Sequence, residues 1–220
     1  MTKNDWLLIG FAGAVAFYLW RQKQLESESL QFTELDSSMP GVVSNVIELF
    51  QPELMTTDPI ALKNRLAFLA TIRAAEGTDK VDDPYTTGYG YADLSGYGLD
   101  THPAMNGWPG VKLPDPYCKA AALSPGCVST AAGAYQITKP TYLRLMARLK
   151  TTDFSPMTQD EMALELAREK GALSEIDNGN IVAAVAHLAS VWASLPGSAA
   201  GQGTRTVAFI QDAFDTAVTA

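Results

Sequence analysis

The chain has 220 residues, only two of them His and two Cys, and a formal net charge of -8, with 16 Lys and Arg against 24 Asp and Glu. This acidic excess argues against a general nucleic-acid binder, which needs a basic surface. Without H-E-x-x-H, C-x-x-C, a Walker loop or a G-x-G-x-x-G turn, we expect no metal site and no cofactor. The length suits one domain with an appendage.

An uncharged segment, "WLLIGFAGAVAFYLW", occupies positions 6–20. As a helix it spans about 22 Å, somewhat less than the ~30 Å hydrocarbon core of a bilayer. Trp6 and Trp20 suit the membrane interfaces, and Arg21 can reach the head groups. The pattern predicts a membrane anchor over residues 1–23. A cleaved signal peptide ending near "AVA" and a buried soluble helix are the alternatives, and the flanking charges leave the orientation open.

The next segment, residues 24–60, is rich in acidic residues, Ser and Pro. This composition predicts a stalk that holds one short amphipathic helix near 42–50. The stalk either extends the reach of a tethered domain or docks on a virion or membrane protein, and the sequence does not separate the two.

A helix is predicted from residue 61 onward, because apolar residues recur every three or four positions at Leu62, Leu66, Leu69 and Ile72. Two turns beyond Leu69 the same stripe reaches Glu76. The next residue is Gly, which is typical just past a helix end. A carboxylate is therefore expected on the buried face of the last turn.

The rest of the domain, residues 61–220, is predicted to be mainly helical, with one irregular region at 84–128 whose Tyr, Gly, Asp and Pro residues indicate hairpins and loops. The fold class expected is α+β, mainly α, with a small β wing and a single transmembrane helix before it. Four helices should follow the wing. They are expected at 139–150, in "QDEMALELAREKG" after a Thr158–Glu161 capping box, from Asn180 to about Leu195, and in "TRTVAFIQDAFDTAV".

Cys118 and Cys127 flank a short loop in the irregular region. Beyond an export signal, a local disulfide is expected between them, and it would contribute roughly 2–3 kcal/mol by the chain-entropy model. Two free thiols in a cytosolic domain are the alternative.

Glu76 is the candidate catalytic residue. A carboxylate among apolar neighbours at the carbonyl end of a helix has a raised pKa, so it stays protonated near neutral pH and can serve as a general acid in glycosidic cleavage. The alternative is an ordinary last-turn Glu that extends to solvent or pairs with Arg73.

A second motif, "STAAGAYQI" at 129–137, combines small residues with a Tyr and a Gln. Small residues let the backbone approach a bulky ligand, Tyr offers an amphipathic face, and the Gln amide both donates and accepts hydrogen bonds. Polysaccharide sites need this mixture. The candidate substrate-binding residues are Ser129, Thr130, Gly133, Tyr135 and Gln136.

Taken in order, these pieces resemble the phage lambda-type endolysins, lysozyme-like lytic transglycosylases that cut peptidoglycan. The resemblance covers about 62–217. The matching pieces are "AAEGT", a Tyr-rich stretch ending "THP", "STAAGAYQ", "DFSPMTQDEMALELAREKGAL" and "WASLPG". Ala131 and Ala134 stand where the family's motif often has Gly and Arg, the Cys118–Cys127 segment looks like an addition, and the first 60 residues have no counterpart.

The resemblance implies that Glu76 is the sole catalytic acid and base. It would protonate the oxygen between N-acetylmuramic acid and N-acetylglucosamine, then take a proton from the muramic C6 hydroxyl as this attacks C1 to give a 1,6-anhydro sugar. Such a reaction needs no second carboxylate.

A hydrolase remains the alternative, with a second carboxylate from the wing. The candidates, otherwise expected to serve turns and caps, are Asp79, Asp82, Asp83, Asp93 and Asp100. The aromatic residues that could stack on sugars are Tyr89, Tyr91, Trp108 and Tyr117. Trp192 and His187 are expected to be structural, and His102 is unassigned.

The expected protein is membrane-anchored, at the bacterial inner membrane or a virion membrane, with its catalytic domain facing peptidoglycan glycan strands. It would act in lysis from within or in wall penetration at entry. A structural or wall-binding virion module that kept the fold without catalysis is the rival hypothesis.

Overall fold

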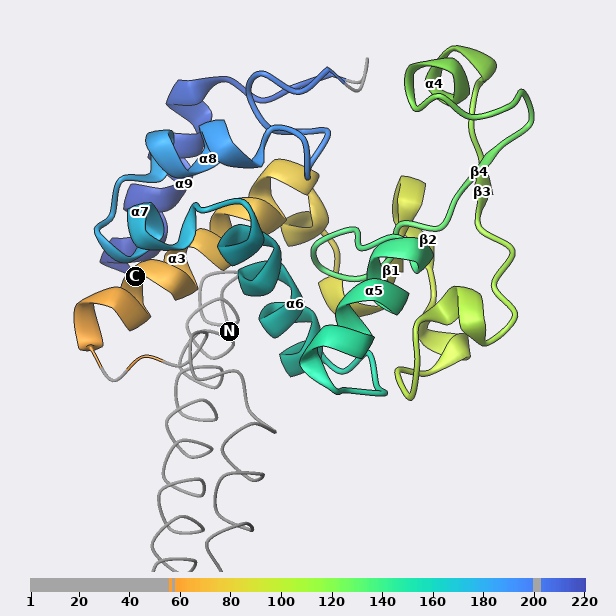
Figure 1. The fold of residues 1–220 in the computed structure, drawn as a ribbon, viewed down its shortest axis with the longest axis horizontal. Coiled ribbons are helices and arrows are strands. Elements are labelled where there is room, and N and C mark those ends of the chain that lie inside the picture. Colours follow the sequence, from red (N-terminus) through yellow and green to blue (C-terminus); the bar gives the residue numbers. More distant parts are fainter. Residues whose placement is uncertain (1–55, 57, 200–202) are drawn as a thin grey trace, which may run out of the picture. The chain divides into compact units, whose positions relative to one another are not determined.

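The computed structural model describes residue 56, residues 58–199 and residues 203–220 (Figure 1). The predicted anchor, and all of the predicted stalk except its last few residues, lie outside these ranges, so both stay predictions. Within the described ranges no helix is both long and apolar enough to cross a bilayer. Contacts group residues 51–219 into one unit, which is described by itself.

The first described helix, α3 (Pro59–Glu76), confirms the predicted helix that leads to Glu76. Its amino end is capped by Asp58, whose side chain accepts a hydrogen bond from the Ile60 N–H at 2.9 Å. Its carboxyl end is closed by Gly77, which has a φ of 78° and donates its N–H to the Arg73 carbonyl. Glu76 is therefore held at a fixed helix end.

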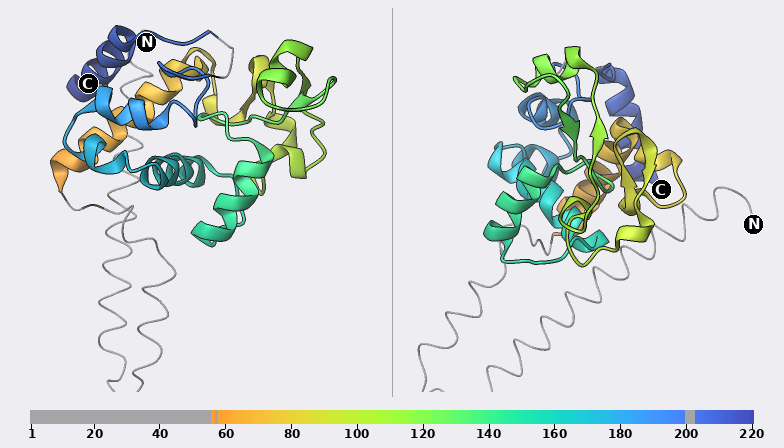
Figure 2. Two further views of the ribbon diagram at one scale, coloured as in Figure 1. Left: turned by 45° about the horizontal axis from the view of Figure 1, so that its top comes forward. Right: turned by 90° about the vertical axis from the view of Figure 1, so that its right-hand side faces the viewer.

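In the described residues, five further helices follow the wing, and α3 packs against three of them, α9, α7 and α6. The five helices are α5 (Lys139–Leu149), α6 (Pro156–Glu169), α7 (Leu173–Asp177), α8 (Ile181–Leu188) and α9 (Val207–Thr219). Figures 1 and 2 show α3 and α7–α9 gathered on one side and the strands, α4 (Asp115–Ala120) and α5 on the other, with α6 running between them.

The wing, residues 84–129, is built from two short antiparallel hairpins and several turns of 3-10 helix, as expected for this composition. One hairpin pairs β1 (Thr87–Gly88) with β2 (Ala92–Asp93), and the other pairs β3 (Val111–Lys112) with β4 (Val128–Ser129). The 3-10 turns are η2 (Thr78–Lys80), just before the wing, and η3 (Pro84–Thr86), η4 (Tyr89–Tyr91), η5 (Ser95–Tyr97) and η6 (Pro103–Met105) within it. Mainly helical with a small amount of sheet, the fold agrees with the predicted class for the described residues.

Between β3 and β4 lies a short helix, α4 (Asp115–Ala120), which was not predicted. The structure joins Cys118, on this helix, to Cys127 in a disulfide, with Cα atoms 5.8 Å apart. The bridge closes the tip of an arm formed by residues 111–129, which extends away from the helices (Figure 1).

Two helix boundaries differ from the prediction. The helix α8 ends at Leu188 rather than near Leu195, and residues 189–197 continue as turns. Trp192 and Leu195 are nevertheless buried, so the apolar stripe arises from turns that return to the core rather than from one straight helix. In α6 the cap is Ser155, three residues before the predicted Thr158, because Pro156 already occupies the first helical position.

Candidate active site

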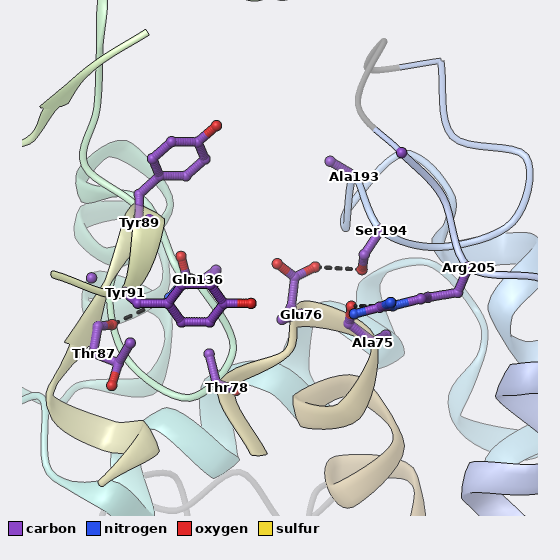
Figure 3. Close-up of a pocket in the computed structure, with 13 residues that line it drawn as sticks. Ala75, Glu76, Thr78, Thr87, Tyr89, Tyr91, Gln136, Ala193, Ser194 and Arg205 are labelled. Carbon is purple, nitrogen blue, oxygen red and sulfur yellow. Dashed lines mark hydrogen bonds between the residues drawn. The ribbon is translucent and has the colours of Figure 1, made fainter. Parts of the chain in front are cut away.

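Glu76 projects into a cleft of about 340 Å³ (Figure 3). Four separate parts of the chain form it. The lining residues are Ala75, Glu76, Thr78, Thr87, Gly88, Tyr89, Gly90, Tyr91, Gln136, Ala193, Ser194, Gly203 and Arg205. The end of α3 therefore lies between the first hairpin of the wing, the segment around Gln136 and the chain that links α8 to α9.

On one wall, Ser194 donates its hydroxyl hydrogen to Glu76 Oε1, with 2.6 Å between the oxygens. Burial raises the pKa of Glu76 above its usual value of 4.5, while the Ser194 hydrogen bond and the Arg205 charge oppose this shift without cancelling it. The side chain is partly exposed to the cleft. The predicted direction of the pKa shift is thus reproduced, with desolvation as its main cause.

Arg205 is fixed in place on the same wall. Its Nε donates to the Ala75 carbonyl at 3.0 Å, its backbone N–H donates to the Ser194 carbonyl at 2.7 Å, and its guanidinium lies 5.0 Å from the centre of the Phe209 ring. These contacts tie the α8–α9 link to the end of α3. The positive charge of Arg205 is consequently held near Glu76 by the folded backbone and by the Phe209 ring.

The opposite wall carries Tyr91 and Gln136, and Figure 3 shows the Tyr91 hydroxyl pointing toward Glu76. Tyr91 (φ 64°) and Gln136 (φ 49°) are two of the four non-Gly residues with positive φ in the described part of the chain. Such backbone strain gathers at functional sites. Gln136 Nε2 donates to the carbonyls of Thr87 and Gly133, at 3.2 and 3.0 Å, which fixes its orientation.

Gly77 lets the two walls approach each other. A Cβ at this position would lie 2.7 Å from the Tyr91 hydroxyl oxygen, and its φ of 78° already disfavours any other residue. The Glu-Gly pair of the sequence therefore sets both the helix end and the width of the cleft.

Glu76 is the only carboxylate among the described residues that line the cleft. The five candidate aspartates of the wing do not line the cleft. Two of them cap turns, which is the alternative, structural role expected from the sequence. Asp83 accepts hydrogen bonds from the Tyr85 N–H and the Thr86 hydroxyl, and Asp93 accepts from the Ser95 N–H. The cleft thus offers one titrating acid, flanked by a hydroxyl and a cation.

Of the five predicted substrate-binding residues, only Gln136 lines this cleft. Ser129 and Thr130 are partly exposed but serve the local backbone, accepting hydrogen bonds from the N–H groups of Ala131 and Lys139. Gly133 is buried. The structure therefore gives these three residues no contact with the cleft around Glu76.

Tyr135, which was predicted to offer a face to the substrate, has a fully buried side chain and does not line the cleft around Glu76. Its hydroxyl donates to Asp160 Oδ1 at 2.5 Å and accepts from Arg73 Nη1 at 2.7 Å, and Asp160 also accepts from the Tyr85 hydroxyl. This network joins α3, α6 and the wing beneath the cleft. Arg73 is thereby engaged with Tyr135, so the alternative pairing of Arg73 with Glu76 is not observed.

Some of the aromatic residues predicted to stack on sugars line the cleft, and others are buried. Tyr89 and Tyr91 line the cleft and are available for stacking, whereas Trp108 is buried against Gly88. His102 is fully buried; its Nε2 contacts the Ile137 carbonyl at 2.9 Å and its ring packs beside Tyr142 and Phe154, so it is structural.

Sequence reasoning missed Ser194 and Arg205. Ser194 lies in "WASLPG", which was quoted only as part of the resemblance, and Arg205 is the single charged residue between 197 and 211. The isolation of Arg205 from other charges was the one feature of the sequence that could have marked it as a site residue. Both residues lie more than a hundred positions from Glu76 in the sequence, and local patterns do not predict such long-range contacts.

Comparison with known proteins gives a consistent result. The family model described as Endolysin matches residues 66–220. The endolysin of Escherichia phage lambda is 36% identical over 142 residues, covering 63% of this chain and 80% of that protein. The endolysin of Escherichia phage P2 is 35% identical over 150 residues, covering 64% and 84%.

Among solved structures, bacteriophage lambda lysozyme complexed with a chitohexasaccharide matches with a TM-score of 0.58 at 30% identity, covering 70% of this chain and 94% of that one. A second structure of lysozyme from bacteriophage lambda matches with a TM-score of 0.51 at 28% identity, covering 71% and 90%. The described domain therefore has the fold of that lysozyme.

Proposed function

Because the chain belongs to the endolysin family, we propose that it cleaves the glycan strands of peptidoglycan, with Glu76 as its catalytic acid and base. The observation that carries this proposal is the position of Glu76, a carboxyl group with a raised pKa that lines a cleft of about 340 Å³. A protonated carboxyl is the group that the first step requires.

In that step, Glu76 donates its proton to the oxygen that links N-acetylmuramic acid to N-acetylglucosamine, as the bond from this oxygen to C1 breaks. The Glu76 carboxylate that remains is stabilised by the Ser194 hydroxyl and by the positive charge of Arg205. Both groups favour the ionised form, so they assist the loss of the proton in the step where it is transferred.

The second step distinguishes a lytic transglycosylase from a hydrolase, and we propose the former. The Glu76 carboxylate takes the proton of the muramic C6 hydroxyl, whose oxygen attacks C1 and closes a 1,6-anhydro ring. Glu76 is protonated again and no water is consumed. This reaction uses one carboxylate, which agrees with a cleft lining that, in the described residues, holds no other. A hydrolase of the usual kind needs two carboxyl groups across the scissile bond.

Mass spectrometry of the products tests this assignment. Peptidoglycan digested with the full-length protein should give muropeptides that end in 1,6-anhydro-N-acetylmuramic acid, which are lighter by one water than reducing-end products. Products with reducing ends from the wild-type protein would overturn the transglycosylase mechanism and indicate that the protein cleaves the same bond by hydrolysis.

The pH dependence should respond to Ser194. Glu76 acts first in its protonated form, so activity falls as pH rises through its pKa. Ser194→Ala removes a hydrogen bond that favours the carboxylate, which raises this pKa further and moves the alkaline limb of kcat/KM to higher pH. The matched control is Ser124→Ala, at an exposed serine of the arm. A shift toward lower pH, or the same shift in the control, would contradict the role given to Ser194.

A membrane anchor at residues 6–20 is a further part of the proposal, because this segment carries no charge and is flanked by Trp. It would hold the catalytic domain near the peptidoglycan, during lysis or entry. Flotation of the full-length protein with lipid vesicles, lost on deletion of residues 1–23, is the expected behaviour, and flotation that survives the deletion would refute it.

A further inference from the structure

A second cavity, of about 500 Å³, adjoins the cleft of Glu76. It is lined by Tyr135, Gln136, Ile137, Thr138, Thr141, Arg144, Leu166, Glu169, Lys170, Ser190, Val191 and Trp192. The first turns of α5, the end of α6 and the chain after α8 form its walls. The catalytic mechanism described above uses none of its charged groups.

The two cavities share their boundary. Gln136 lines both, and Trp192 of the second cavity is followed directly by Ala193 and Ser194 of the first. Because consecutive Cα atoms are only ~3.8 Å apart, the segment at 192–194 borders both cavities, as Gln136 does. The second cavity is therefore placed to receive something attached to a sugar held at Glu76.

The side chains that line the second cavity have a net positive charge, whereas the chain as a whole is negative. The chain carries a net charge of -8, yet the cavity presents two cations, Arg144 and Lys170, against one carboxylate, Glu169. Arg144 Nη1 donates to Glu169 Oε1, with about half of the Arg144 side chain exposed. No ion-pair partner for the Lys170 ammonium occurs in the described part of the chain. A ligand with carboxylates and an amine would complement this set.

The remaining lining adds hydroxyls and an apolar floor. The Thr138 and Thr141 hydroxyl oxygens lie 3.0 Å apart, and the ring of Trp192 is almost fully buried beneath the cavity. Such a mixture suits a short peptide with small apolar side chains and free carboxylates. A bare chain of N-acetylglucosamine has no charge for Lys170 to bind.

We propose that this second cavity binds the peptide stem of the N-acetylmuramic acid next to the scissile bond. The assignment rests on the proposed function, since the stem is the charged, peptidic part of peptidoglycan and is linked to the sugar through a lactyl group. Lys170 binds a stem carboxylate, and Glu169 lies within reach of an amino group where the stem carries one.

The test uses full-length protein carrying Glu76→Gln, so that the ligand stays intact. Its Kd is measured by calorimetry for two soluble tetrasaccharides of alternating N-acetylglucosamine and N-acetylmuramic acid, one with tetrapeptide stems and one with the stems removed. The stem-bearing ligand should bind more tightly. Lys170 is exposed, so adding Lys170→Gln should reduce that preference by about two- to fivefold, the range expected for one solvent-exposed ion pair.

The control is Lys63→Gln in the same background, the same change at an exposed lysine of α3 outside the cavity. It should keep the preference. Equal affinity for both ligands in the parent protein, or the same preference in the Lys170 and Lys63 variants, would overturn the assignment. If the wild-type protein instead leaves peptidoglycan uncut, the proposed function fails, while the binding comparison still decides what the second cavity holds.

Discussion

Replacing Glu76 with Gln should reduce peptidoglycan cleavage by about 10²- to 10⁴-fold, the usual contribution of a general acid–base group. Gln has the same shape and keeps an acceptor for the Ser194 hydroxyl, but it has no proton of suitable acidity to donate. The measurement is turnover of purified peptidoglycan by the full-length protein, with circular dichroism to check the fold.

The same substitution should leave the protein as stable as before, or more so, at neutral pH. Burial raises the pKa of Glu76, so the unfolded chain releases this proton at lower pH than the folded one. Stability is therefore lost as pH rises through the usual value of 4.5 toward the raised pKa, and the loss persists above it. Gln does not ionise and avoids that loss.

Asp82→Asn is the matched control, because Asp82 is an exposed carboxylate near the wing that does not line the cleft. It should keep full activity. A folded Glu76→Gln protein that still cleaves peptidoglycan would disprove the assignment of the acid. A folded wild-type protein that binds peptidoglycan without cutting it would favour the rival hypothesis of a structural or wall-binding module.

Replacing Gln159 with Leu should lower the free energy of unfolding by roughly 3–5 kcal/mol, since unpaired buried polar groups cost about 1–3 kcal/mol each. Gln159 is fully buried. Its Oε1 accepts from the Ala134 N–H at 2.9 Å, and its Nε2 donates to the carbonyls of Phe154 and Tyr85, at 2.8 and 3.1 Å. Leu fills a similar volume but leaves one donor and two acceptors without partners.

This amide also shapes the segment that carries Gln136 into the cleft. Gly133 has a φ of 75°, and a Cβ there would lie 2.0 Å from Gln159 Oε1, so the turn and the amide form one unit. Chemical denaturation of the full-length protein gives the measurement. The control is Gln211→Leu on α9, where the amide donates only to Asp215 one turn away. It should change stability by no more than about 0.5 kcal/mol, and an equally small effect at Gln159 would contradict the account.

Local patterns in the sequence predicted the parts of the molecule that local interactions determine. The apolar stripe of α3 leads to Glu76 because both depend on helical periodicity, and the Gly and Tyr content of the wing indicated its hairpins. The helices α4 and α7 were missed because six and five residues are too short to show a period. The boundary of α8 was overextended because turns can also return apolar residues to the core.

The site was predictable only in part, for a related reason. Gly133 and Tyr135 belong to a distinctive motif, but that motif builds the support beneath the cleft, where Tyr135 joins Arg73 and Asp160 in a buried network. Residue type alone does not tell a supporting Tyr from one that contacts a ligand. Ser194 and Arg205 reach Glu76 only through tertiary packing, so no spacing in the sequence predicts their role.

Because the cleft is formed by segments that lie far apart in the sequence, its parts are translated at different times during synthesis. Glu76 leaves the ribosome long before Ser194 and Arg205 are translated, and α9, which packs against α3, is made after both. A growing chain therefore carries the acid without the wall that supports it. The cleft around Glu76 is therefore complete only after the segment that carries Ser194 and Arg205 has been made and has packed against the end of α3.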